Sequence, residues 1–393
     1  MISAIPERVK SKSPADVFPP EAGGIMGCPK GSTMELPVLP ALEKRARLIG
    51  MSRGQLEELV RSLGEPGYRA GQLARWIYQR GARSFAEMSD LPAALRQRLA
   101  NAADVGRSEV ALRQESADGT AKLLLRLEDD RRIETVLLPY EERTSVCVSS
   151  QVGCPVGCIF CATATMGFGR NLTAGEIIDQ VLTAREHAPG GRLTHVVVMG
   201  MGEPLLNYEE LVKALRIIHD EVGLSYRHLT VSTAGHVPGI RGLAEEGIPV
   251  TLALSLHGPN DELRARLIPM SKKWGVGEVM DAVRDYTTKT GRRVTLEYLL
   301  LANVNDEVEH ARQLADLCRG MISHVNLIPW NPADSFTRFE APSRNRVRAF
   351  RSVLEERGIT VTQRVERGQD IAAACGQLAV DAGESRVARQ ACW

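Results

Sequence analysis

From residue 144 onwards, short apolar runs alternate with amphipathic stretches of helical length. Runs of strand length lie near residues 144–149, 194–199, 228–232, 249–255, 294–301 and 324–328. Helical patterns separate them, near residues 173–187, 208–220, 237–246, 276–290 and 305–319. Such alternation predicts an α/β fold whose parallel sheet has right-handed crossovers and is either a barrel or doubly wound. Six units of this kind make a partial barrel that is open on one side.

The flanking regions differ in composition from this core. Residues 1–37 hold many prolines and glycines without a sustained apolar period, which predicts a disordered tail. Residues 38–107 have helical patterns and residues 108–142 hold two β-rich runs, so we expect a helical accessory domain and a small β extension. The partial barrel then spans residues 143–364, and residues 365–393 form a C-terminal segment.

The predicted accessory domain has recognisable helix boundaries and a local excess of positive charge. Ser52 and Gln55 form a capping-box pattern, and a third helix is expected from Asp90, with Pro92 in its first turn. Residues 41–107 contain twelve Lys and Arg but seven Asp and Glu, although the net charge of the whole chain is only +1. The excess indicates either a solvated helical surface or a domain that contacts RNA phosphates.

The cysteines are few and clustered. Of the eight in the chain, four fall between Cys147 and Cys161. The N-terminus has no apolar stretch typical of a secretory signal, and no apolar run approaches the ~18–20 residues of a membrane span. We therefore expect a cytoplasmic protein without membrane association, where clustered cysteines indicate metal or redox chemistry. We expect Cys28 and Cys392 to be incidental thiols, and Cys318 to lie in the core.

Three of the clustered cysteines, Cys154, Cys158 and Cys161, directly follow the first predicted barrel strand. Their spacing places three thiolates on one compact loop at the carboxyl end of that strand, where such folds carry their chemistry. A four-iron cluster with three protein ligands keeps one iron open to a small molecule. A structural zinc site would need Cys147 as a fourth ligand. A thioredoxin-like redox pair would use Cys158 and Cys161 and leave Cys154 without a role.

The Cys-x₃-Cys-x₂-Cys loop resembles that of the radical S-adenosylmethionine (radical SAM) enzymes. The resemblance implies that Cys154, Cys158 and Cys161 hold a [4Fe–4S] cluster, whose open iron binds SAM and whose electron cleaves SAM to a 5′-deoxyadenosyl radical. Met199–Leu205 is similar to the family's glycine-rich SAM-binding segment, in which Glu203 would accept from the SAM ammonium. The expected SAM-binding residues lie mostly at successive strand ends, and they are Gly202, Glu203, Ser232, Ser255, Leu256, His257 and Asn331. Taken singly, such a serine is more often a helix cap, and such a histidine a satisfied core residue.

Further motifs resemble one subfamily, the RNA adenine methyltransferases RlmN and Cfr. These motifs are Arg132–Val136, Ser149–Cys154, Ala374–Leu378, and the helical stretches Gly67–Ala70 and Trp76–Tyr78. The resemblance covers roughly residues 38–385 and is closer to RlmN. It implies methylation of carbon 2 of an adenosine in the peptidyl-transferase centre of 23S rRNA, and of the adenosine next to the anticodon in some tRNAs. Cfr-type methylation of carbon 8 would use the same cysteines and stays open.

The resemblance implies three catalytic residues, Cys375, Cys147 and Glu134. Cys375 would take a methyl group from one SAM, and the radical from a second SAM would abstract hydrogen from that S-methyl group. Carbon 2 of adenine is electrophilic and therefore does not attack the methyl group of SAM directly. The resulting carbon radical would instead add to the adenine. Cys147 would then attack the Cys375 sulfur, forming a disulfide and freeing the product, with Glu134 as proton acceptor. Two thiols 228 residues apart (375 − 147) must therefore approach to ~4–7 Å between their Cα atoms.

The resemblance also implies partners. These are 23S rRNA, tRNA, and a flavodoxin-like electron donor, with an external reductant to reopen the disulfide; the protein itself is expected to be a monomer. The target adenosine must be unpaired or pulled out of its stack to reach a buried pocket. The candidates for phosphate contact near the C-terminus are Arg344, Arg346, Arg348 and Arg351. In the alternative interpretation, these four side chains only solvate the surface of their helix. In a different class, a non-catalytic, metal-stabilised RNA-binding protein would leave Cys375 without a role.

Overall fold

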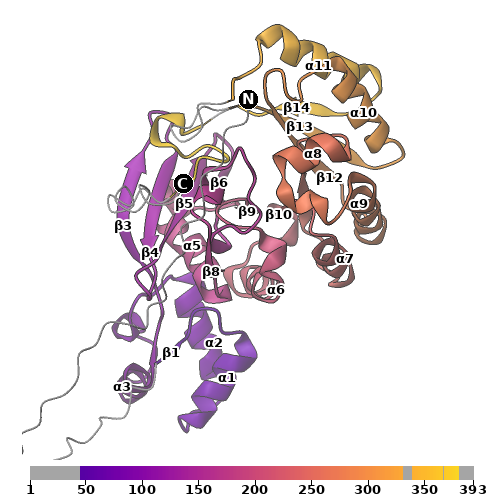
Figure 1. Ribbon diagram of the computed structural model, residues 1–393. Coiled ribbons are helices and arrows are strands. Elements are labelled where there is room, and N and C mark those ends of the chain that lie inside the picture. Colours follow the sequence, from indigo (N-terminus) through magenta and orange to yellow (C-terminus); the bar gives the residue numbers. More distant parts are fainter. Residues whose placement is uncertain (1–44, 331–338, 366, 380–393) are drawn as a thin grey trace, which may run out of the picture. The chain divides into compact units, whose positions relative to one another are not determined.

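The computed structural model describes residues 45–330, 339–365 and 367–379 (Figure 1). The predicted tail at residues 1–37, the thiols Cys28 and Cys392, and Asn331 lie outside the described residues. Among the helices within these ranges, none has the length and apolar character needed to cross a membrane.

Within the described ranges, ten strands form one sheet whose central part runs in chain order (Figure 1). Each central strand pairs in parallel with the next: β6 (Thr144–Cys147), β9 (His195–Val198), β10 (Leu229–Thr233), β11 (Thr251–Ser255), β12 (Val294–Leu300) and β13 (Ser323–Pro329). Because this order never reverses, the sheet lacks the switch point of a doubly wound fold. The predicted partial barrel of six strand–helix units is confirmed.

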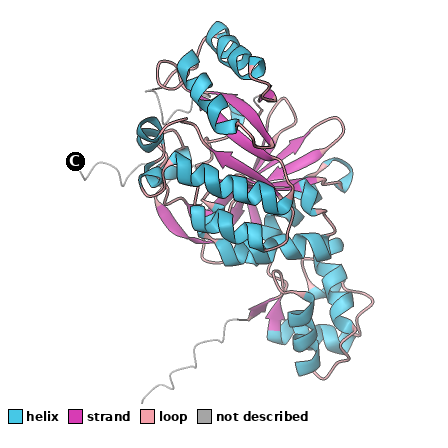
Figure 2. Cartoon of the chain, turned by 90° about the vertical axis from the view of Figure 1, so that its right-hand side faces the viewer, coloured by secondary structure: helices cyan, strands magenta, loops and turns pink. Residues whose placement is uncertain are grey.

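Helices connect the successive strands and cover one face of the sheet (Figure 2). They are α5 (Ala174–His187), α6 (Tyr208–Ile217), α7 (Val237–Glu245), α9 (Val276–Thr290), α10 (Val308–Cys318) and α11 (Arg344–Glu356). The sequence predicts the first five of these helices to within a few residues. It does not predict the short helix α8 (Asp261–Leu267), because seven residues span too few turns to show an apolar period. After α11, the short strand β14 (Val361–Gln363) pairs in parallel with β13.

The β extension continues the barrel sheet rather than forming a separate one. Strands β3 (Glu109–Glu115), β4 (Ala121–Arg126) and β5 (Arg132–Pro139) pair antiparallel, and β5 pairs antiparallel with β6. The two β-rich runs of the sequence correspond to β4 and β5. Strand β3 is missed because its residues are almost all exposed, so the sequence there has no apolar alternation.

The helical region before the extension follows the predicted boundaries with one correction. Helix α1 (Arg53–Ser62) begins at the predicted Ser52 cap, and α2 (Arg69–Ala74) continues as a π-helical turn. Helix α3 (Ala93–Ala102) begins three residues later than the predicted start at Asp90. The reason is Pro92, which has an extended ψ of 141° and stands before the first turn instead of within it. Two short parallel strands, β1 (Ala46–Arg47) and β2 (Ala103–Asp104), close this region.

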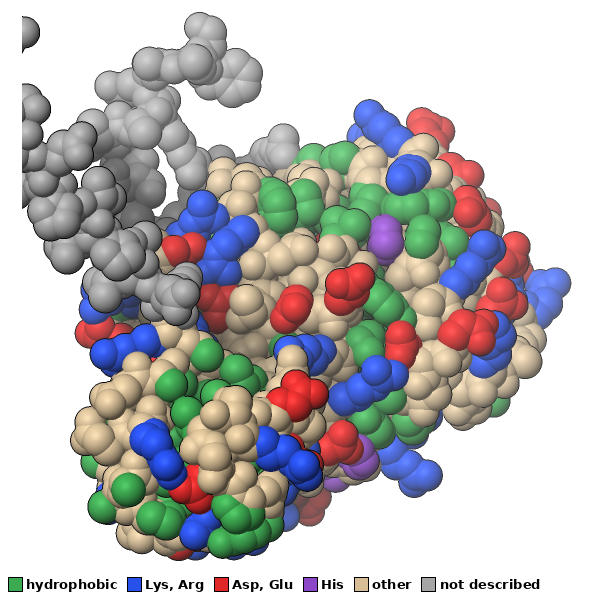
Figure 3. All heavy atoms as spheres, turned by 90° about the horizontal axis from the view of Figure 1, so that it is seen from below, with side chains coloured by type: hydrophobic (Ala, Val, Ile, Leu, Met, Phe, Trp, Pro, Cys, Tyr) green, Lys and Arg blue, Asp and Glu red, His purple; other side chains and the backbone are tan. Residues whose placement is uncertain are grey.

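Among the described residues, much of the basic excess of this region is paired with acidic side chains. Seven of the twelve Lys and Arg side chains pair with carboxylates, and these are Arg47, Arg53, Arg61, Arg69, Arg83, Arg98 and Arg107. On the face seen in Figure 3, basic and acidic side chains are interspersed. The charge count of the sequence alone therefore overstates the positive potential that the region offers to a phosphate backbone.

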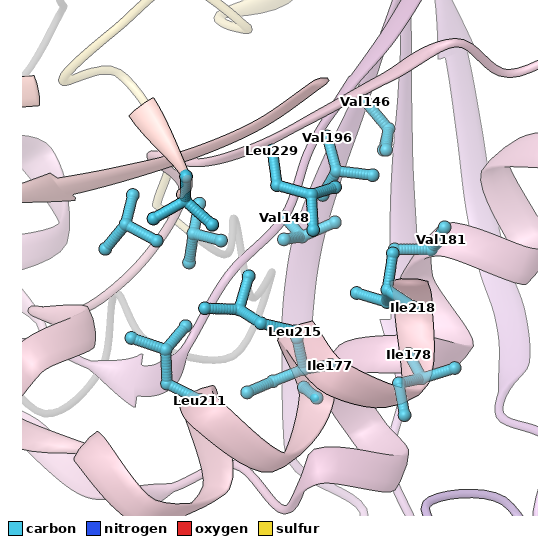
Figure 4. Close-up of a cluster of buried hydrophobic side chains, with 14 of the residues drawn as sticks. Val146, Val148, Ile177, Ile178, Val181, Val196, Leu211, Leu215, Ile218 and Leu229 are labelled. Atoms are coloured by element: carbon cyan, nitrogen blue, oxygen red, sulfur yellow. The ribbon is translucent and has the colours of Figure 1, made fainter. Parts of the chain in front are cut away.

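The core fixes the barrel strands against the first two helices. Figure 4 shows Val146 of β6, Val196 of β9 and Leu229 of β10 above side chains of α5 and α6, including Ile178 and Leu215. All five are fully buried or nearly so. Each such side chain contributes about 1.5–3 kcal/mol relative to exposure, so this packing holds the strands firmly against the helices.

One close backbone approach joins the N-terminal region to the barrel. Gly50 has φ +89°, and a Cβ there would lie 2.5 Å from the backbone nitrogen of Gly175 in the first turn of α5. We expect Gly50→Ala to lower the free energy of unfolding by about 2–4 kcal/mol, measured by chemical denaturation. Gly64→Ala is the matched control, since Gly64 has φ +75° and open space around it. Equal losses in the two variants would show that the close approach contributes nothing.

Candidate active site

A cavity opens at the carboxyl ends of the parallel strands, where a barrel of this kind places its chemistry. Residues at or just after the strands line it, and they include Cys147, Gly202, Ser232, Ser255, Leu299 and Ile328. Another wall comes from residues 367–378, here named the Cys375 segment, which lies beside β5 and β6 in Figure 1. The cavity thus brings together residues that are far apart along the chain.

The three predicted cluster ligands, Cys154, Cys158 and Cys161, line this cavity on the loop after β7 (Gln151–Gly153). The loop is fixed by a hydrogen bond from Cys154 N–H to the carbonyl of Gly167 (2.9 Å). Burial raises the pKa of all three thiols. Within the described residues, no three His, Cys, Asp or Glu side chains converge on a single-ion site. The three thiols line one wall and are close enough for the charges of Cys154 and Cys161 to raise the pKa of Cys158 further, an arrangement that fits the separate irons of one cluster.

The segment after β9 presents a crowded glycine and a buried carboxylate. Gly202 has φ +105°, and a Cβ there would lie 2.6 Å from the Cβ of Gln151, so the position requires glycine. Glu203 is buried and accepts hydrogen bonds from the N–H of Leu205 (3.2 Å) and of Ala234 (2.7 Å). Burial raises the pKa of Glu203 to about 7. The carboxylate keeps a lone pair free for a further donor. The contact with the SAM ammonium itself stays a prediction.

The ends of β10 and β11 contribute two hydroxyl groups to the cavity. Ser232 and Ser255 both line it, and their hydroxyl oxygens lie 3.5 Å apart. Leu256 does not line the cavity, and its fully buried side chain belongs to the core. The fully buried Arg264 of α8 donates to the carbonyls of Leu256 (3.1 Å), Ser255 (3.3 Å) and Ala234. Helix α8, which the sequence does not predict, therefore fixes both strand ends.

His257 lines the cavity as a neutral ring. Its Nδ1 accepts a hydrogen bond from the N–H of Leu299 (3.0 Å), and its ring stacks edge-on against Phe160 with centroids 5.0 Å apart. Burial, with a smaller contribution from the Arg264 guanidinium, lowers the pKa of His257 to about 3. The proton of the neutral ring is therefore on Nε2. The ring is both a satisfied core histidine and part of the cavity wall.

This pKa shift predicts a pH-dependent loss of stability. The unfolded chain protonates His257 below about pH 6.5, whereas the folded protein does so only near pH 3, so stability falls as the pH drops between these values. Between pH 7.5 and pH 5 the loss from this residue is about 2 kcal/mol. We expect His257→Gln, whose amide oxygen still accepts from Leu299, to remove this loss in urea unfolding. If the free energy of unfolding falls equally in the two proteins as the pH is lowered, the assignment is wrong.

Cys147 and Cys375 line the same cavity although 228 residues (375 − 147) separate them. Cys147 is half-buried at the end of β6, and Cys375 is exposed. Burial, followed by the neighbouring Cys375, raises the pKa of Cys147 to about 12, and the charge of Arg364 acts in the opposite direction. The six cysteines of the described residues are all free thiols. The structure thus places the two predicted reactive thiols and the cluster loop around one space.

Hydrogen bonds tie the Cys375 segment to the cluster loop. The N–H of Ala162 donates to the carbonyl of Gly376 (2.7 Å), and the hydroxyl of Thr163 donates to the carbonyl of Leu378 (2.6 Å). Ala162 follows directly after Cys161, one of the cluster cysteines. Gly376, the residue after Cys375, is therefore hydrogen-bonded to the loop that would carry the cluster.

The opposite end of the segment is tied to the β extension. The N–H of Gly368 donates to Asp118 (3.0 Å), and the ammonium of Lys122 donates to the carbonyl of Ala372 (3.3 Å). Lys122 also forms a buried ion pair with Glu134 (3.0 Å). Glu134 does not line the cavity, although it shares a strand face with Val136 of the lining. Its predicted role as proton acceptor therefore stays a prediction.

Several lining residues are absent from the sequence-based prediction, among them the polar side chains of Glu297, Trp330 and Arg364. Glu297 is buried in β12 and accepts from the amide of Asn326 (2.8 Å), and burial raises its pKa. A lone acid within the apolar strand Val294–Leu300 is a signal that could have revealed it. The negative charge of Cys375 raises the pKa of Arg364, with smaller contributions from Glu297 and Cys147. No local pattern marks Arg364.

The lining fits the cofactors that the resemblance implies. Three thiols share one wall, and the glycine at position 202 lets a ligand approach the backbone closely. The indole N–H of Trp330 is buried and has no hydrogen-bond partner among the described residues. Such a donor is rarely left unpaired in a folded protein, so it is available to a ligand in the cavity. These residues fit a cluster together with a polar small molecule.

Comparison with known proteins agrees with this geometry. Residues 148–315 match the radical SAM superfamily, and residues 46–105 match the ribosomal RNA large subunit methyltransferase N-terminal domain. The first match includes the cluster loop and the strand ends from β9 to β12, and the second coincides with the helical region.

Similarity extends over most of the chain. It is 50% identical over 338 residues to a probable dual-specificity RNA methyltransferase RlmN of Symbiobacterium thermophilum, covering 85% of this chain and 91% of the relative. It is 47% identical over 350 residues to the dual-specificity RNA methyltransferase RlmN of Halorhodospira halophila, covering 88% and 97%. The crystal structure of a radical SAM methyltransferase from Sphaerobacter thermophilus superimposes with a TM-score of 0.82 at 47% identity, covering 84% and 98%. The chain therefore belongs to the RlmN family of radical SAM RNA methyltransferases.

Proposed function

We propose that this protein methylates carbon 2 of an adenosine in 23S rRNA and of the adenosine next to the anticodon in tRNAs. As a member of its family it is a radical SAM RNA methyltransferase, and it uses a [4Fe–4S] cluster and SAM. The relatives named above are described as dual-specificity RNA methyltransferases, which supports two classes of RNA substrate. The ring carbon and the course of the reaction are the finer part of the proposal.

The observation that carries the proposal is the meeting of two distant thiols beside the cluster loop. Cys147 and Cys375 line one cavity with Cys154, Cys158 and Cys161. Carbon 2 of adenine is electrophilic, so transfer of a methyl group to it requires a carbon radical rather than nucleophilic attack by the base. A thiol that carries the methyl group and a second thiol that releases the product meet this requirement.

The residues of the chain then have distinct tasks. When bound, the cluster and SAM supply the one-electron chemistry that removes a hydrogen atom from a methyl group. Cys375 carries that methyl group on its sulfur, and Cys147 forms a disulfide with Cys375 to release the methylated base. Arg364, charged and close to both thiols, stabilises negative charge on either sulfur. Glu134 is the proposed acceptor of the ring proton, held by its ion pair with Lys122.

The partners follow from this chemistry. We propose a flavodoxin-like electron donor for the cluster and an external reductant that reopens the disulfide. We also propose that the protein is a monomer and acts in the cytoplasm. Among the predicted phosphate contacts of α11, Arg346 and Arg351 pair with carboxylates, so they are weaker candidates than Arg344 and Arg348.

An anaerobic reaction with rRNA fragments, tRNA and isotopically labelled SAM tests the proposal. Mass spectrometry of the product nucleosides should find 2-methyladenosine, with one S-adenosylhomocysteine and one deoxyadenosine formed per methyl group transferred. Exclusive formation of 8-methyladenosine would assign the Cfr-type reaction instead. Zinc in place of iron, together with RNA binding but no methyl transfer, would favour a non-catalytic RNA-binding protein.

A further inference from the structure

Two arginines contact the ring of one tyrosine at the edge of the cavity. The guanidinium carbons of Arg143 and Arg367 each lie 4.6 Å from the centroid of the Tyr140 ring. Arg364 lines the same cavity as Tyr140 and Arg367, and this cavity also holds Cys147. These four side chains, Tyr140, Arg143, Arg364 and Arg367, are named the arginine cluster below.

Arg143 and Arg367 differ from most of the arginines described above because no carboxylate in the part of the chain that the structure describes pairs with them, whereas Arg364 lies near the buried carboxylate of Glu297. Within the described residues, no carboxylate forms an ion pair with Arg143, Arg364 or Arg367. The acids of the same turn, Glu141 and Glu142, are exposed and form no such pair either. The like charges of Arg143 and Arg367 on one ring repel one another, and a bound anion would relieve that repulsion.

The arginine cluster is also joined to the reactive thiol by the chain itself. Arg364 follows β14 directly, and Arg367 begins the Cys375 segment. Arg367 donates to the carbonyl of Pro139, the last residue of β5, and Arg143 lies in the turn between β5 and β6. An anion held here would therefore bridge the β5–β6 turn and the start of the Cys375 segment.

We propose that the arginine cluster is a phosphate-binding subsite that holds a phosphodiester group next to the target adenosine. The inference rests on the proposed function for the identity of that adenosine. Guanidinium groups bind phosphate oxygens in a planar, bidentate manner, and Tyr140 keeps two of them oriented by cation–π contact. A base inserted toward Cys375 carries its own phosphates at the edge of the cavity, where the cluster lies. The phosphate contact thus positions the nucleotide without reading its sequence.

The test uses the full chain with its cluster, and a short RNA hairpin that carries the target adenosine. In one version of the hairpin, a neutral methylphosphonate replaces the phosphate on one side of that adenosine, and in another version the phosphate on the other side. The variants are Arg143→Ala and Arg367→Ala. Arg241→Ala is the matched control, because Arg241 is an exposed arginine on the outer helix α7 and does not line the cavity. Binding is measured by fluorescence anisotropy over a range of KCl concentrations.

We expect each cluster variant to bind the unmodified RNA about tenfold more weakly, and the salt dependence of log K to fall in slope by about 0.7–0.9. Arg241→Ala should change neither value. One of the two methylphosphonates should weaken binding to the wild-type protein by a similar factor, and should not weaken the cluster variants further. If a cluster variant and the methylphosphonate each weaken RNA binding by their full factor when they are combined, the proposed subsite is wrong. Because Arg143 lies outside the Cys375 segment, its variant still tests the inference if Arg367→Ala displaces that segment.

Two further readouts separate the possible causes of failure. The carboxylate of SAM is another anion, so SAM affinity is measured in parallel, and a tenfold loss there with unchanged RNA binding would overturn the inference. Methyl transfer is followed in the same samples. If the wild-type protein methylates the hairpin while the variants keep full affinity and slope, the subsite is wrong and the proposed function stands. If the losses in binding occur but no methyl group is transferred, the subsite stands and the proposed function is wrong.

Discussion

Replacement of Cys375 by alanine is expected to abolish methyl transfer to RNA, lowering product formation by at least ~10³-fold. Cys375 is exposed on a segment held by backbone hydrogen bonds, so the loss of its sulfur leaves the fold intact. Without that sulfur no S-methyl group forms, and the electrophilic carbon of the base has no methyl carrier. Methylated adenine is counted by mass spectrometry, and iron content shows that the cluster is retained.

The matched control is Cys318→Ala. Cys318 lies in the core at the end of α10 and is buried, as the sequence predicted, and it does not line the cavity. This variant should keep its methyl transfer with a small loss of stability. Substantial methylation by Cys375→Ala would show that the methyl group reaches the base without this thiol.

Replacement of Cys147 by alanine has a different expected outcome, a covalent adduct between protein and RNA. With Cys375 methylated and added to the base, the second thiol is needed to displace the product. Turnover should stop after the first cycle, and the adduct should approach one RNA per chain on a denaturing gel. Digestion with a nuclease should remove the shifted band.

The double variant Cys147→Ala with Cys375→Ala isolates the origin of the adduct. It should form none, because the sulfur that joins the RNA is absent. An adduct in the double variant would point to a different attachment site, and normal turnover of Cys147→Ala would rule out the two-thiol scheme.

Much of the barrel could be predicted from the sequence because its strands are buried and its helices are long. Strands such as Val294–Leu300 and helices such as Val276–Thr290 show their periods clearly. The errors have physical causes: β3 is exposed along its length, and α8 is too short to show a period. The start of α3 shifted because Pro92 stands outside the helix.

The candidate site was predictable only where chemistry leaves a local pattern. The spacing of Cys154, Cys158 and Cys161 on one loop favours an iron–sulfur cluster, and the resemblance to radical SAM enzymes specifies it. Arg364 shows no such pattern, since its importance arises from the return of the chain to Cys147 across the sheet. The approach of Cys375 could be expected only from the resemblance, because no local rule links residues so distant in sequence.

The hydrogen bonds that hold the Cys375 segment bear on the timing of a reaction cycle. The same sulfur serves SAM first and a nucleobase afterwards, and we expect residues 367–378 to detach between the two steps without global unfolding. Among the described residues, hydrogen bonds hold the segment near its two ends, and local opening of such a segment costs far less than unfolding the whole protein. We expect the amide protons of Gly368 and Ala162 to exchange with deuterium faster than those of β12. Equal protection would mean that the thiol serves both partners from a single fixed position.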